Sequence, residues 1–143
     1  MPAKERAFRP DPVAFRDETG LRCLRVPLDR AGRRHAIVSE TDYRRVRALG
    51  ATSPWYMNEA GPGRAYVRTH LNADQGSQTL GMVARLITGA GPRTTIHYAS
   101  GNRLDLRPSN LIMRKGKAKR TDAALAQRGA ELRAGKALDD RIR

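Results

Sequence analysis

Apolar positions alternate with basic ones in the first patterned stretch of the chain, and this alternation predicts a β-strand. The run LRCLRVPLD over 21–29 places Leu24 and Val26 on one face, as expected for a half-buried strand. The turn RAGRR separates it from a second short strand, HAIV, over 35–38. Residues 1–20 show no period and contain several prolines, so we expect an arm there.

A helix start follows the second strand. Ser39 is a favourable N-cap residue, and Asp42 provides a carboxylate in the first turn, where it favours helix initiation. The helix that this pattern predicts buries Tyr43 and Val46 and stops at Gly50.

The second half of the chain predicts a hairpin, a helix, another pair of strands and a final helix. The hairpin strands are WYMNE and RAYVRTHL, on either side of an AGPG turn. Helical spacing then runs from Leu80 to Ile87, and Gly89 breaks it. The segment TTIHYASGNRLDLRPSNLIM predicts strand, polar loop and strand. Residues 117–143 predict a helix with a sparse apolar stripe of Leu125, Leu132 and Leu138. This order of elements indicates an α+β protein.

The net charge of the chain indicates which class of molecule it binds. The chain has 28 Lys and Arg residues against 14 Asp and Glu, a formal net charge of +14, and 23 of the basic residues are Arg. Arg presents a planar fork of donors that suits phosphates, so a pI near 11.3 favours a nucleic-acid partner. Apolar runs are short and the start is charged, so we expect no transmembrane helix, no secretory signal and no membrane partner. The single cysteine, Cys23, fits a reducing, cytoplasmic location.

One segment carries a specific motif. The run ARLITGAGPRTTIHYASGNRLDLRPSNLIMR over 84–114 resembles the HNH endonuclease family, in the version found in phage and mobile-element proteins. The positions that match the family pattern are Arg85, Leu86, Ile87, His97, Gly101, Asn102, Leu104, Asp105, Arg107, Ser109, Asn110 and Leu111.

The resemblance implies a ββα-metal fold, in which two antiparallel strands and a helix surround one divalent cation, Mg²⁺ or Mn²⁺. By position, it makes His97 the general base that activates water and Asn110 the residue that ties the loop between the strands and orients His97. On this basis the chain divides into a basic, Pro-containing arm (1–20), a small α+β sheet region with one helix (21–79), an HNH-like ββα motif (80–120) and a basic helical tail (121–143).

The sequence departs from the family at the metal ligands. The family has a metal-binding Asp directly before the base, where this chain has Ile96, and a second ligand nine residues after the loop-tying Asn, where it has Lys119. The earlier family His is replaced by Ala84. A hard divalent cation needs oxygen donors, which Ile lacks, and the Lys ammonium repels the ion. We therefore expect no metal and no other cofactor.

These departures favour a nucleic-acid-binding protein, for DNA in preference to RNA, on a nuclease-like scaffold that is not an enzyme. The expected phosphate-binding residues are Arg93, Arg103, Arg107, Arg114, Lys115, Lys117, Lys119 and Arg120, with Arg44, Arg45 and Arg47 from the first helix. Candidates for base contacts are Asn58, Arg64 and Arg68. Two alternatives stay open: an active HNH endonuclease, and a basic structural component of a nucleoprotein or phage assembly. The tail 121–143 is a candidate for a protein partner or self-association.

Overall fold

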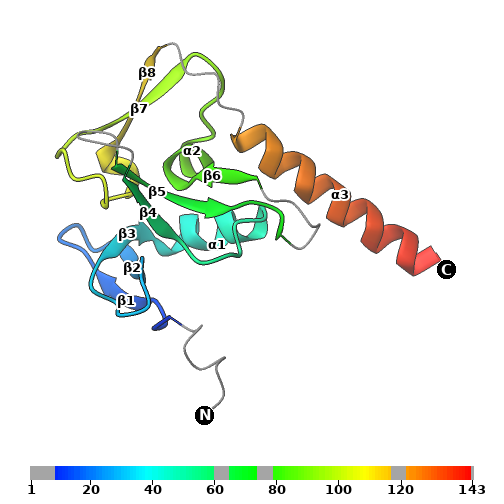
Figure 1. Ribbon diagram of the computed structural model, residues 1–143, viewed down its shortest axis with the longest axis horizontal. Helices are drawn as coiled ribbons and strands as arrows, with labels where there is room; N and C mark the ends of the chain where they lie inside the picture. The colour runs from blue at the N-terminus through cyan, green and yellow to red at the C-terminus, as the bar shows by residue number, and fades with distance from the viewer. Residues whose placement is uncertain (1–8, 60–64, 74–78, 117–121, 143) are drawn as a thin grey trace.

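Three small antiparallel sheets and three α-helices make up the chain in a computed structural model (Figure 1). The structure describes residues 9–59, 65–73, 79–116 and 122–142. The class is α+β, as the order of elements predicted. Among the described residues, no helix is both long enough and apolar enough to cross a membrane.

The first sheet contains β1 (Val13–Arg16), β2 (Arg22–Pro27) and β3 (His35–Ser39), in that order. The predicted strands β2 and β3 are confirmed, and Leu24 and Val26 of β2 are buried. The expectation of an arm over 1–20 missed β1, an edge strand whose residues are largely exposed. The arm is also not basic, because this segment holds four basic and four acidic residues.

Helix α1 (Glu40–Ala48) forms as its capping signals predict. The Ser39 hydroxyl accepts a hydrogen bond from the backbone N–H of Asp42, at 3.1 Å. Val46 is fully buried, and Gly50, with φ +114°, takes the chain away from the helix.

The second sheet contains β4 (Tyr56–Glu59), β5 (Ala65–His70) and β6 (Leu80–Met82). The predicted hairpin is confirmed, but the predicted helix start at Leu80 is wrong. Leu80–Met82 pair with the end of β5, so the helix α2 (Val83–Thr88) begins only after them. Gly89, with φ +72°, ends α2 as expected.

The third sheet is a two-stranded hairpin of β7 (Thr94–Tyr98) and β8 (Leu111–Lys115). The short 3-10 helix η3 (Pro108–Asn110) leads into β8. The strand–loop–strand prediction is therefore confirmed. A continuous core lies beneath the three sheets, and its largest fully buried apolar side chains are Trp55, Leu71, Leu86, Leu106, Val38, Val46, Val67 and Val83.

Helix α3 (Asp122–Ile142) packs against α2 and runs away from the β7–β8 hairpin (Figure 1). It docks through a small and polar face. Ala126 is buried, and Arg133 donates to the Asn72 side chain at 2.6 Å. The Asp122 carboxylate accepts from the backbone N–H of Met82 at 2.6 Å.

The leucine stripe predicted for this helix is not its packing face. Leu125 and Leu132 are 38% and 54% exposed, and the side chain of Leu138 lies outside the described residues. The helix packs instead through Ala126 and Gly129, because a short side chain is needed where Asn72 lies close to the helix backbone.

Candidate nucleic-acid interface

The β7–β8 hairpin separates its side chains onto two faces. Ile96 is partly buried and packs against the core, whereas the next residue, His97, is exposed. His97 lies opposite Ile112, and Thr95 lies opposite Arg114, so these four side chains share the outer face. The imidazole Nε2 lies 3.2 Å from the Thr95 hydroxyl oxygen. Ile96 thus has a packing role that favours an apolar side chain at this position.

Asn110 spans the loop that joins the two strands. Its side-chain oxygen accepts from the backbone N–H of Ser100 at 2.8 Å. Its amide nitrogen donates to the carbonyls of Asn102 and Asp105, at 3.2 and 2.9 Å. The residue is only 5% exposed, so these bonds replace water on both sides of the loop. The single side chain fixes the loop that follows the His97 strand.

The same loop is anchored to the first sheet. Leu104 accepts from the backbone N–H of Ile37 at 2.8 Å, and Leu106 donates to the carbonyl of Ile37 at 2.7 Å. Leu106 is fully buried. The loop end of the hairpin is therefore tied to the first sheet, although residues 99–102 of the loop remain exposed.

Arg107 belongs to an ion cluster rather than to a free phosphate-binding surface. Its guanidinium lies 2.7 Å from Asp105, 2.9 Å from Asp17 and 3.0 Å from Glu18, and its side chain is 17% exposed. These carboxylates occupy the donors that a phosphate would need. The expectation that Arg107 binds phosphate is therefore wrong for the folded chain, and Arg107 joins the hairpin loop to the β1–β2 turn.

The carboxylates of this cluster are held in the ionised form. Hydrogen bonds from the Thr19 hydroxyl and then from Arg107 and backbone N–H groups lower the pKa of Asp17 to about 2, although burial opposes the shift. Burial also opposes ionisation of Asp105, but hydrogen bonds from Arg107 outweigh it and lower the pKa of Asp105.

The open end of the hairpin carries three exposed cations. Thr94 pairs with Lys115, and the backbone N–H of Gly116 donates to the carbonyl of Arg93 at 2.8 Å, so the backbones of Arg93, Arg114 and Lys115 are close, with Arg114 on the His97 face of the hairpin and Lys115 on the other face. None of these three side chains makes a hydrogen bond or ion pair with any other described residue. Their charge is therefore available to an external anion.

Arg103 is partly committed to the protein. It donates to the carbonyl of Ala65 at 3.2 Å, and its guanidinium carbon lies 5.4 Å from the centroid of the Tyr98 ring. Burial raises the pKa of Tyr98 above its ordinary value. Arg103 therefore contributes to positioning the loop against β5.

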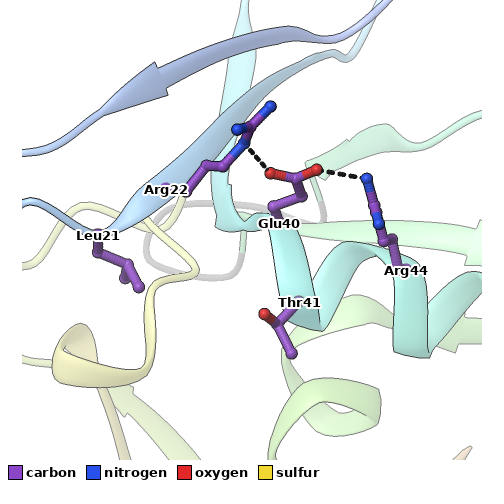
Figure 2. Close-up of a pocket in the computed structure, with 5 residues that line it drawn as sticks. All are labelled: Leu21, Arg22, Glu40, Thr41 and Arg44. Carbon is purple, nitrogen blue, oxygen red and sulfur yellow. Dashed lines mark hydrogen bonds and ion pairs between the residues drawn. The ribbon is translucent and has the colours of Figure 1, made fainter.

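The arginines of α1 are held by the helix's own carboxylates. Arg44 lies 2.6 Å from Glu40, and Arg45 lies 3.1 Å from Asp42 and donates to the carbonyl of Ile87. Figure 2 shows that Glu40 also pairs with Arg22, so one carboxylate serves two guanidinium groups. The cleft beside them, of about 430 Å³, is thus lined by one carboxylate and by the two guanidinium groups that pair with it.

The other residues expected to contact nucleic acid either bond within the protein or lie outside the described residues. Arg68 donates to the Asn58 side chain at 2.7 Å, so these two candidates for base contacts are bonded to each other. Arg47 donates to the carbonyl of Thr52 at 3.3 Å, over the ring of Tyr43. The remaining expected residues, Arg64, Lys117, Lys119 and Arg120, lie outside the described residues.

Arg85 has a role that the sequence did not reveal. It is 2% exposed and donates to the carbonyls of Thr94 and Gly91, at 2.7 and 2.8 Å. These bonds fix the turn that delivers the chain into β7. The only signal in the sequence is a charged residue inside the apolar stripe of α2, a pattern typical of a buried, fully bonded Arg.

The hairpin does not present the ligands of a divalent cation. Ile96 offers no donor atom beside His97, and among the described residues no group of three or more His, Cys, Asp or Glu side chains is arranged to hold a metal ion. The described residues assemble a clamped loop, an exposed imidazole and three exposed cations at the open end of the hairpin. No family model, curated protein or solved structure matches the chain.

Proposed function

We propose that the chain binds nucleic acid, DNA in preference to RNA, through the open end of the β7–β8 hairpin and without a metal ion. The observation that carries this proposal is that Arg93, Arg114 and Lys115 all stand at the open end of the hairpin, exposed on its two faces and without an ion-pair partner among the described residues. Two of the three are placed by antiparallel strands, so the cations are held on a regular element.

The energetic basis is counterion release. Each phosphate that a Lys or Arg neutralises frees condensed cations from the duplex, and this term provides most of non-specific affinity. The sequence adds Lys117, Lys119 and Arg120 directly after β8, which gives six basic residues for one stretch of backbone. No metal is needed for such binding, because Arg and Lys meet the phosphate oxygens directly.

The scaffold we infer is a strand–loop–strand hairpin similar to that of the HNH family, although the helix that follows it, α3, packs against α2 and runs away from the hairpin. The support for it is the strand–loop–strand order over 94–115 and the loop tie made by Asn110. The residues present do not fit the family's metal, because Ile96 faces the core and has no donor. The scaffold then serves to present cations rather than to activate water.

A second candidate function is cleavage of DNA with His97 as the general base. The observation that favours it is the exposed imidazole on β7, directly before the loop that Asn110 clamps. Incubating supercoiled plasmid with the chain and Mn²⁺ tests it. Nicking by the wild type that His97→Ala abolishes would establish the endonuclease, and intact plasmid is the result our proposal expects.

The proposed function is tested by titrating a fluorescent duplex with the chain in EDTA at several salt concentrations. If about six phosphates are neutralised, a log–log plot of affinity against salt should have a slope near −5. Loss of binding on chelation, or affinity that does not change with salt, would contradict metal-free phosphate binding.

A further inference from the structure

A second cleft, of about 470 Å³, lies between the segment before β1, the end of β2, helix α1 and the start of β4. Its volume is within the range of small-ligand sites, roughly 300–1,000 Å³. In Figure 1 the first sheet lies at the opposite end of the molecule from the open end of the β7–β8 hairpin, whereas the loop end of the hairpin contacts β3. The cleft is therefore separate from the hairpin cations.

One side of the cleft is aromatic and apolar. The rings of Tyr43 and Trp55 lie 5.3 Å apart between centroids, inclined at 59°. Pro12, Pro27 and Pro54 line the cleft beside them. Trp55 is 2% exposed, and its indole N–H is buried without a hydrogen-bond partner among the described residues. Trp55 is therefore the buried backing of this wall, and the partly exposed Tyr43 ring with Pro12 and Pro54 forms the flat surface that a planar ligand can contact.

The other side of the cleft is cationic. Arg47 is held by the carbonyl of Thr52 and lies over the Tyr43 ring, 5.4 Å from its centroid. Arg9 is held by the carbonyl of Trp55. Neither makes an ion pair with a described carboxylate, although Asp11 also lines the cleft. Backbone carbonyls position both guanidinium groups at the edge of an apolar surface, and Asp29 acts on Arg9 through its charge without forming an ion pair.

We propose that this cleft binds a nucleotide, with the base against the aromatic and proline side and the phosphate on Arg9 and Arg47. A ligand that is planar and apolar at one end and anionic at the other matches both walls, and guanidinium groups favour phosphate oxygens. The inference rests on the proposed function in one respect, the source of the nucleotide. If the chain binds DNA, the nucleotide in the cleft is an unstacked residue of the bound strand. A free nucleotide shares the same chemistry.

The chain has one tryptophan, Trp55, so its intrinsic fluorescence reports on this cleft alone. Titrating the full chain with thymidine 5′-monophosphate should give a saturable change, checked by calorimetry. Arg47→Ala should weaken binding roughly tenfold, as expected for loss of a charge-assisted contact. Arg44→Ala is the matched control: it lies on the same helix, outside the cleft, and should leave the affinity unchanged. Arg9→Ala gives a second test if Arg47→Ala does not fold.

Further ligands separate the sources and the alternatives. Tighter binding of a thymidine hexanucleotide than of the mononucleotide would place the ligand within a strand, and equal binding would support a free nucleotide. Inorganic phosphate that competes as well as the mononucleotide would overturn the role of the aromatic wall. A proline-rich peptide that binds where the mononucleotide does not, or no saturable signal by either method, would overturn the proposal.

The hairpin variant Arg93→Ala/Arg114→Ala/Lys115→Ala distinguishes this inference from the proposed function. It should keep mononucleotide binding, because it leaves the cleft intact, while losing duplex affinity. If the wild-type chain binds the mononucleotide but does not bind duplex DNA, that result would contradict the proposed function alone. Duplex binding without mononucleotide binding would contradict the cleft proposal alone.

Discussion

The β7–β8 hairpin and helix α1 are both rich in basic residues, yet arginines of the helix form ion pairs and the cations of the hairpin strands do not. In α1, Arg44 and Arg45 lie beside Glu40 and Asp42, one helical turn away. In the hairpin, the strands and their flanks carry cations with no carboxylate close to them among the described residues. The two regions show that a count of basic residues does not measure the charge available to a partner.

The difference has a local cause. Carboxylates at i±3 and i±4 spacing on a helix meet arginines without any tertiary structure. On a strand, neighbours in sequence point to opposite faces, so Arg114 and Lys115 could be neutralised only by the partner strand, which offers Thr95 and Thr94. The hairpin cations are therefore left to solvent or to a ligand.

The largest effect should come from removing the hairpin cations. The triple variant Arg93→Ala/Arg114→Ala/Lys115→Ala should lose roughly 100-fold in duplex affinity at low salt, and its log–log salt slope should fall by about 3, since about 0.9 is lost per phosphate contact. Fluorescence anisotropy in EDTA measures both. The control Arg44→Ala/Arg45→Ala removes two arginines already paired and should change affinity no more than about twofold. Equal losses in the two variants would remove the distinction between the regions.

The next effect concerns the loop that holds the hairpin. Asn110→Ala leaves the buried carbonyl of Asp105 and two partly buried backbone groups, of Ser100 and Asn102, without their partner, so the free energy of unfolding should fall by roughly 1–3 kcal/mol. Urea unfolding measures this loss. Ser109→Ala, at the exposed neighbouring position, should stay within about 0.5 kcal/mol of the wild type. If the two variants are equally stable, Asn110 does not clamp the loop as described.

The Arg107 cluster should make stability depend on acid. The folded pKa of Asp17, about 2, is below its ordinary value of 3.8, so its contribution is present above about pH 4 and is lost as the pH falls towards 2. The melting temperature of the wild type should drop over this interval. Arg107→Gln should lower the melting temperature at pH 7 by several degrees and make the acid drop shallower, because only Thr19 and the backbone N–H of Leu21 then hold the carboxylate.

A matched charge removal checks that assignment. Arg30→Gln takes one charge from an exposed position outside the cluster and should reproduce neither change. An acid transition that is identical in Arg107→Gln and the wild type would show that the cluster does not link the hairpin loop to the first sheet.

The smallest expected effect comes from freeing the helix arginines. Glu40→Gln removes the carboxylate that holds Arg22 and Arg44, so duplex affinity should rise a few-fold and the salt slope should steepen by about one to two. Glu131→Gln raises the net charge by the same amount on the exposed side of α3 and should have no such effect. A gain that is equal in both variants would mean that net charge, rather than unpaired charge, controls binding.

Local patterns in the sequence predicted the elements that local forces determine. The strands β2 and β3 and the capped helix α1 follow directly from alternation and from the Ser39 hydroxyl. Tertiary partners decided the remainder. The strand β1 forms because β2 pairs with it, and Leu80 joins a strand because His70 lies opposite.

The candidate site was predicted in part. The hairpin and its basic residues were visible in the sequence, and Asn110 makes the loop contacts that the family resemblance implied. The ion pair of Arg107 with Asp17 could not be predicted from the sequence, because the two residues are 90 positions apart in the chain. The cleft around Trp55 was also missed, because four separate segments form it.

The most direct test of metal-free binding at the hairpin is to titrate the isotopically labelled chain with a short duplex in EDTA and follow its backbone amide signals by NMR. We predict that the largest shifts fall on β7, β8 and Gly116, and that the signals of Arg44, Arg45 and the rest of α1, apart from Tyr43 and Arg47 in the cleft wall, stay near their free positions. Shifts centred on the exposed arginines of α1, or shifts that occur only after Mg²⁺ is added, would contradict the account.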